Sequence, residues 1–216
     1  MNPNWELKNC CQHEQVQFLV TIGVFTLVIL ALWRTFLLTP FKLITVFLHE
    51  ASHAIACKLT CGEVEGIQVH ANEGGMTQTR GDLGSSFWGM ALILASTNLL
   101  TAKIAAGCLV LSFLLCSSLQ KKRFIIFIAV IWVLQETTKA RILRYIILFI
   151  GVMNSLFSVY DIYDDLISRR VHISDAEKFA ELCPCPCNGA AWGVIWAMIS
   201  FIFLFGAIYL GLVILS

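Results

Sequence analysis

The chain has little charge. Only 13% of its 216 residues are Asp, Glu, Lys or Arg, whereas 58% are hydrophobic. A typical soluble domain is about half apolar and about one quarter charged, so this composition excludes an ordinary soluble domain. The net charge is +1, without the basic stripe that nucleic-acid binding requires. We therefore expect a membrane protein that has the lipid bilayer as a partner and binds no nucleic acid.

The amino-terminal segment lacks a basic cluster. Residues 1–16, "MNPNWELKNCCQHEQV", are polar and precede the first apolar run. A secretory signal peptide starts with a positively charged region, which is missing here. The pattern predicts a polar tail over 1–16, followed by an uncleaved membrane anchor.

Long apolar runs dominate the rest of the chain. A helix needs about 20 apolar residues, and at least 17, to cross a bilayer. The run at 124–135 is shorter, which favours either a buried or re-entrant helix or a short span. We predict an all-α, multi-pass membrane protein of six or seven transmembrane helices, forming one membrane domain over 17–216. The runs are 17–38, 41–59, 83–100, 104–119, 124–135, 145–163 and 190–215.

Two segments between the runs are polar. Residues 60–80 alternate polar and apolar side chains around Gly74 and Gly75, which predicts a small β-hairpin after the second helix. An edge strand could receive an extended substrate, whereas the alternative is a plain solvated hairpin. Residues 166–189 are predicted to form a polar loop before the last helix. Trp33, near the end of a run, is expected to be an interfacial anchor.

The stretch "FLHEASHAIA" places ionisable residues in an apolar helix predicted over 41–59. His49, Glu50 and His53 form H-E-x-x-H, in which histidines at i and i+4 share a helix face and can bind one zinc ion. Glu50 would then act as general base toward a water bound to the zinc. The alternative is a buried polar cluster satisfied by neighbouring helices, but ionisable residues within membrane helices usually mark function.

A catalytic zinc site needs a third protein ligand. The metzincin pattern is excluded, because Ala56 and Leu59 stand where it requires glycine and histidine. One set of candidates follows the helix in the polar segment, and another ends a helix predicted over 145–165. Asn154 precedes Asp161 by seven residues and so lies on the same helix face. The candidate carboxylates are Glu63, Glu65 and Glu73 in the first set and Asp161, Asp164 and Asp165 in the second.

The segments "HEASHAIA", "EGGMTQTRG" and "NSLFSVYDIYDD" resemble the site-two-protease-like intramembrane zinc metalloproteases. The chain is most similar to the small membrane-metalloprotease-like proteins of plants and microbes, over most of residues 40–215. The resemblance implies that Asn154 and the zinc ligand Asp161 come from one late helix. Such proteases usually have a proline between these two residues and a glycine after the aspartate. This chain has neither, so Asp164 and Asp165 stay alternative ligands.

A second departure concerns "TQTRGDLGSSFWGM". Relatives carry an apolar stretch and a Pro-Ala-Gly-Tyr-like turn before "LGSSFWG", whereas here residues 80–82 join the two segments directly. We interpret the chain as a shortened member. The resemblance implies a Zn²⁺-dependent endopeptidase acting on membrane proteins or peptides, with a substrate strand near Gly74 and Gly75 and with Asn154 holding substrate. The alternatives are a non-catalytic scaffold or chaperone that binds transmembrane helices and, third, a transporter.

Overall fold

The computed structural model describes residues 12–33, 35–59, 68–69, 75–76, 83–115, 133, 142–163 and 188–216. This part of the chain is almost entirely helical, which confirms the predicted all-α class. The helices are α1 (His13–Leu32), η1 (Phe36–Leu38), α2 (Thr39–Leu59), α3 (Leu83–Ala95), α4 (Leu99–Leu115), α6 (Ile142–Tyr163) and α8 (Gly189–Ile214).

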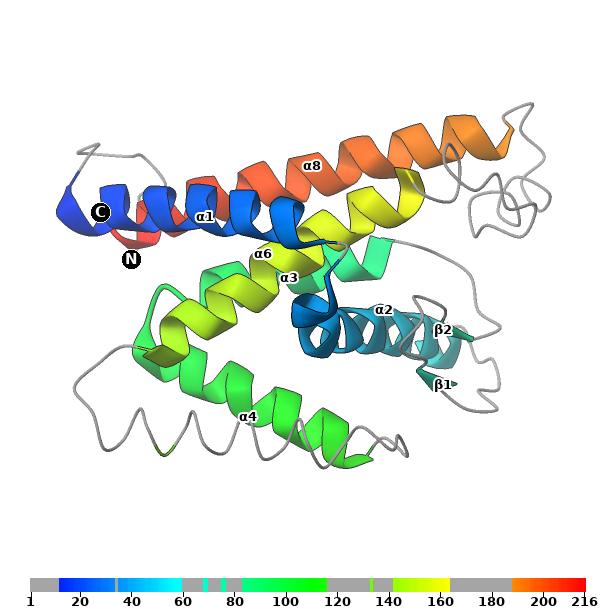
Figure 1. Ribbon diagram of the computed structural model, residues 1–216, viewed down its shortest axis with the longest axis horizontal. Coiled ribbons are helices and arrows are strands. Elements are labelled where there is room, and N and C mark those ends of the chain that lie inside the picture. Colours follow the sequence, from blue (N-terminus) through cyan, green and yellow to red (C-terminus); the bar gives the residue numbers. More distant parts are fainter. Residues whose placement is uncertain are drawn as a thin grey trace.

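Helix α6 lies at the centre of the bundle. It contacts α1, α2, α3, α4 and α8 (Figure 1). Helices α1 and α8 run antiparallel and side by side, and α2 and α4 lie on the opposite side of α6. Because α6 reaches all these neighbours, side chains on its different faces determine where each of them packs.

Two of the described helices, α1 and α8, are long and apolar enough to cross a membrane. Their outward faces carry large exposed apolar side chains, among them Leu27 at 69% and Phe205 at 67% exposure. Such surface is stable in lipid and costly in water. The total of six or seven spans stays a prediction, and the run at 124–135 lies outside the described residues except for Val133.

Helix α1 begins at His13, before the apolar run predicted from residue 17. The amide of Gln12 donates to Gln15 Oε1 at 3.0 Å, which satisfies one amide at the helix start. The same Gln15 side chain is buried and donates from Nε2 to the carbonyl of Leu212 in α8 at 3.0 Å. This contact between distant segments explains why a polar residue of the predicted tail belongs to the bundle.

The apolar run predicted over 83–100 is broken between α3 and α4. Asn98 Oδ1 accepts a hydrogen bond from the amide of Leu100 at 3.0 Å and so caps the start of α4. Arg144 of α6 donates from Nε to the Ser96 carbonyl at 2.9 Å and from Nη2 to the Thr97 carbonyl at 2.6 Å. The two carbonyls that follow the last turn of α3 are thus satisfied by a cation from α6.

Small residues bring α3 and α6 together. A β-carbon added at Gly151 would stand 2.8 Å from the Ile93 amide nitrogen, and one at Gly89 would stand 2.8 Å from that of Ser155. Small residues four apart, such as Gly151 and Ser155, allow helix backbones to approach closely in membranes. Helix α3 is also joined to α8, since Ser86 Oγ donates to Ser200 Oγ at 2.6 Å in the buried interior.

The strands β1 (Gln68–Val69) and β2 (Gly75–Met76) are two residues each and pair antiparallel. Gln68 stands opposite Met76, and Val69 stands opposite Gly75. Both strands contact α2, near its carboxyl end (Figure 1). Gly74 and the other residues of the segment predicted as a hairpin lie outside the described residues.

Candidate metal centre

The H-E-x-x-H motif lies within one uninterrupted helix, α2. An α-helix turns about 100° per residue, so the backbone positions of His49 and His53 are stacked one turn apart. The Ser52 hydroxyl donates to the carbonyl of His49, which keeps this polar group satisfied inside the helix. The side chains of Glu50 and His53 lie outside the described part of the structure.

His49 points into the bundle and is only 7% exposed. Its imidazole packs against the phenyl ring of Phe157 in α6, with ring centroids 6.2 Å apart and planes inclined by 65°. Aromatic rings in this edge-to-face arrangement attract each other. Helices α2 and α6 therefore pack together at the motif.

Aromatic side chains surround this contact. Trp33, just after α1, lies 4.4 Å from Tyr160 and 6.1 Å from Phe157, measured between ring centroids. The Lys42 Nζ atom of α2 lies 4.9 Å from the centroid of the Trp33 ring. Trp33 is 5% exposed, so the expectation of an interfacial anchor is wrong, and the ring instead joins α1 to α6. We call Trp33, Phe157 and Tyr160 the aromatic cluster.

Helix α6 carries the second group of predicted site residues. Asn154 is fully buried, and it precedes Phe157 by three residues. Asp161 follows Phe157 by four residues and lies in the last turn of α6. Residues at these spacings share one helix face. The backbone of Asp161 is therefore one turn beyond the ring that touches His49, whereas its side chain lies outside the described part.

The donor set on these two helices suits zinc. Imidazole nitrogen and carboxylate oxygen are its usual ligands in proteins, and three of them leave the open position that a catalytic site needs. Among the residues whose side chains are described, no group of three His, Cys, Asp or Glu is found. That set excludes the side chains of Glu50, His53 and Asp161. The other candidate carboxylates, Glu63, Glu65, Glu73, Asp164 and Asp165, lie outside the described residues.

A large apolar cavity of about 690 Å³ also borders α2. Phe47, Leu48 and Ala51 line it together with residues of α3 and α4. At about 100° per residue, these positions lie on the side of α2 roughly opposite His49 and His53. The cavity consequently does not border the histidine face of α2.

Sequence reasoning did not single out Phe157, Tyr160 or Arg144. The sequence did contain a signal for Phe157. This residue lies between Asn154 and Asp161 on the helix face that carries these two candidate site residues. Tyr160 and Arg144 gave no such signal, since their partners come from distant helices.

An apolar helical bundle that carries H-E-x-x-H on one helix and Asn154 and Asp161 on a packed neighbour has the features of a membrane-embedded metallopeptidase. The chain belongs to the Peptidase M50B-like family, the site-two-protease family, whose model matches residues 22–207. The match confirms the resemblance drawn from the motifs and is consistent with a shortened member. This family is membrane-embedded and generally zinc-dependent. No curated protein and no solved structure matches the chain.

Proposed function

We propose that the protein is a multi-pass, zinc-dependent endopeptidase that cleaves membrane-associated or transmembrane peptide segments. The observation that carries the proposal is the contact between His49 of α2 and Phe157 of α6. It brings the H-E-x-x-H helix against the helix that carries Asp161 in its last turn. Membership of the Peptidase M50B-like family supports the same reaction class.

In this proposal His49 and His53 hold zinc from one face of α2, and Asp161 supplies the third ligand from α6. Asp164 and Asp165 are the alternative third ligands. When bound, zinc supplies Lewis-acid activation of water and of the peptide carbonyl. The aromatic cluster and the burial of His49 keep bulk water away from the imidazole and fix its ring orientation.

Glu50 serves as the general base. Its position is about 100° around α2 from His49, which places it beside the histidine face rather than on it. It takes the proton from the attacking water and then donates it to the leaving amine. Peptide hydrolysis needs both transfers, and one carboxylate can perform them in sequence.

The substrate is proposed to bind in an extended form. β1 and β2 contact α2, so an added strand at their edge would pass the motif helix. Gly74 and Gly75 lack side chains and would let a peptide backbone approach closely. Asn154 is assigned to hold a substrate carbonyl, because its amide is a donor on the same face of α6 as Asp161.

The test measures zinc content and cleavage of a membrane peptide by the purified chain in detergent. Glu50→Gln should keep zinc, while cleavage falls by about 100-fold to 10,000-fold because the proton acceptor is gone. His49→Ala or His53→Ala should lose both. His13→Ala is the matched control, since His13 is exposed at the start of α1 and should change neither property.

The third ligand is tested in the same assay. Asp161→Asn should weaken zinc binding more than Asp164→Asn or Asp165→Asn does. Equal zinc retention in all three variants would place the third ligand elsewhere. If the wild-type protein purifies without zinc and cleaves no membrane peptide after zinc is added, the protease proposal is wrong. The non-catalytic scaffold is then the better interpretation.

A further inference from the structure

The indole N–H of Trp33 is a buried donor. The side chain is 5% exposed, and its Nε1 atom has no hydrogen-bond acceptor among the residues that the structure describes. A buried indole N–H usually finds an acceptor, because leaving it unpaired costs free energy and hydrocarbon offers none. An unpaired donor in the interior therefore indicates an acceptor with a particular function.

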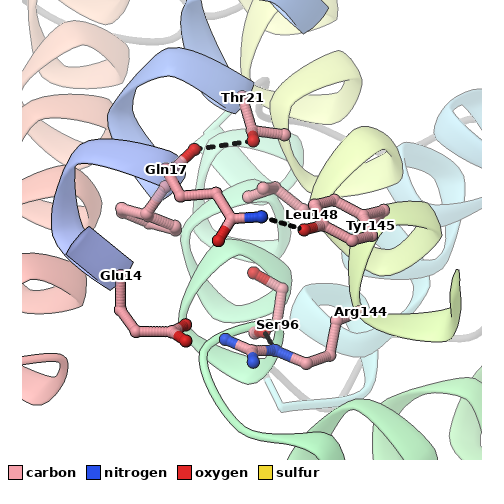
Figure 2. A pocket seen from close by; sticks show the side chains of 8 residues that line it. Glu14, Gln17, Thr21, Ser96, Arg144, Tyr145 and Leu148 are labelled. Carbon is pink, nitrogen blue, oxygen red and sulfur yellow. Dashed lines mark hydrogen bonds between the residues drawn. The ribbon is translucent and has the colours of Figure 1, made fainter. Parts of the chain in front are cut away.

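The other end of α6 shows how polar groups are paired in this bundle. There a polar cavity of about 270 Å³ is bordered by α1, α6 and the residues after α3 (Figure 2). Gln17 Nε2 donates to the Tyr145 hydroxyl at 2.6 Å, and Thr21 Oγ1 donates to the Gln17 carbonyl at 2.7 Å. These side chains are more exposed than Trp33. Groups that could bond to water are thus paired within the protein, whereas the buried N–H of Trp33 is not.

The ring of Trp33 packs on α6 beside the candidate metal centre. Its centroid lies 6.1 Å from that of Phe157 and 4.4 Å from that of Tyr160. Phe157 in turn contacts His49. Asp161 follows Tyr160 directly and stands four residues after Phe157, a spacing that places both on one helix face. Trp33 is therefore packed against the turn of α6 that carries Asp161.

A carboxylate that binds zinc needs hydrogen-bond donors of its own, because these fix the orientation of its oxygens toward the metal. An indole N–H suits this role, since it is a donor only and cannot bind the metal itself. Burial of Nε1 keeps bulk water and a bound peptide away from it. Its acceptor must then be a group of the protein.

We propose that the indole N–H of Trp33 donates a hydrogen bond to the zinc-binding carboxylate of Asp161 and fixes its orientation. The inference rests on the proposed function, in which Asp161 is the third ligand. Trp33 is then a positioning residue, which acts through Asp161 and touches neither zinc nor substrate. Lys42 Nζ lies 4.9 Å from the centroid of the Trp33 ring, and this cation–π contact helps to hold the indole in place.

The test removes the N–H of Trp33 and keeps the shape of the ring. Benzothienylalanine has sulfur in place of the indole N–H, and suppression of an amber codon inserts it at position 33 of the full chain. Co²⁺ stands in for zinc, and its binding in detergent is followed by its visible absorption, without a cleavage assay. We expect the affinity for Co²⁺ to fall by about 10-fold to 100-fold, as is typical when a metal ligand loses its hydrogen-bond partner.

The matched control is the same replacement at Trp88. This tryptophan of α3 lines the large apolar cavity, which does not border the histidine face of α2. The affinity for Co²⁺ should keep its wild-type value in this variant. An equal loss at positions 33 and 88 would overturn the inference, because the effect would then not be specific to Trp33.

A second measurement follows the hydrogen bond itself. In protein with isotope-labelled tryptophan, the indole N–H signal of Trp33 is assigned by its absence from the benzothienylalanine variant. It should move downfield in the NMR spectrum when Zn²⁺ is added, while the signal of Trp88 stays in place. A Trp33 that only fills space would give no such shift.

The outcomes separate this inference from the proposed function. If the wild type binds metal and the variant at position 33 keeps its affinity for Co²⁺, the inference is wrong and the proposed function stands. A Trp33 signal that does not move with Zn²⁺ has the same meaning, and so does a third ligand other than Asp161. Wild-type protein that binds neither Co²⁺ nor Zn²⁺ would overturn both.

Discussion

Helix α6 meets α3 and α2 in different ways. Against α3 it has Gly151 and Ser155, and an added β-carbon at Gly151 would stand 2.8 Å from a backbone nitrogen. Against α2 it has Phe157, whose ring centroid is 6.2 Å from that of His49. The first contact is between backbones, and the second is between side chains. A metal held by side chains from two helices requires the wider spacing found between α6 and α2. The close contact between α6 and α3 holds α6 in place, so that this wider spacing is kept.

The largest effect is expected from breaking the side-chain contact. Phe157→Ala removes a buried ring that touches both His49 and Trp33. Loss of such a ring typically lowers the free energy of unfolding by about 3–5 kcal/mol. Denaturant titration in detergent, followed by circular dichroism, measures the change, and zinc content should fall with it. Phe157→Leu keeps much of the volume and should be affected less. Wild-type stability of Phe157→Ala would show that the ring contact does not hold α2 and α6 together.

The backbone contact is tested by Gly151→Ala. The added methyl group meets the amide of Ile93, and overpacking of this kind costs about 1–3 kcal/mol. The same unfolding titration applies. Gly206→Ala is the matched control, because nothing lies within 4 Å of its added β-carbon and alanine is the better helix former by about 1 kcal/mol. If both variants have the same free energy of unfolding, the close approach of α3 and α6 at Gly151 does not contribute to stability.

The smallest effect concerns a third kind of contact, the hydrogen bond between Ser86 of α3 and Ser200 of α8. Hydrogen bonds between membrane helices average about 0.6 kcal/mol in double-mutant cycles. We expect a coupling free energy of that size from Ser86→Ala, Ser200→Ala and the double variant. A coupling near zero would show that this hydrogen bond does not stabilise the packing of α3 against α8.

Local features of the fold followed from the sequence. Helix α2 was predicted over 41–59 and runs from Thr39 to Leu59. No glycine or proline follows Pro40 in this helix, and Pro40 itself is tolerated in a first helical turn. The spacing of His49 and His53 is equally local. The break at Asn98 was missed because a single polar residue in an apolar run gives a weak signal, although Asn is a preferred amino-terminal cap.

Non-local features did not follow from the sequence. The contact between Phe157 and His49 depends on the register at which α2 and α6 cross. The periodicity of apolar residues along either helix does not specify this register. Trp33 was assigned to the membrane interface from its place at the end of a run, but its partners Phe157 and Tyr160 come from the distant α6. Arg144 and the buried Gln15 likewise depend on partners far along the chain.

The distance along the chain between His49 and Phe157 also sets an order of events during synthesis. About one hundred residues separate them, and a ribosome adds about 5–20 residues per second, so α6 follows α2 by roughly 5–20 s. During that interval the motif helix has no aromatic partner from α6. The newly made protein therefore completes the surroundings of His49 late, after α3 and α4 have been made, and the carboxylate of Asp161 arrives only with the last turn of α6.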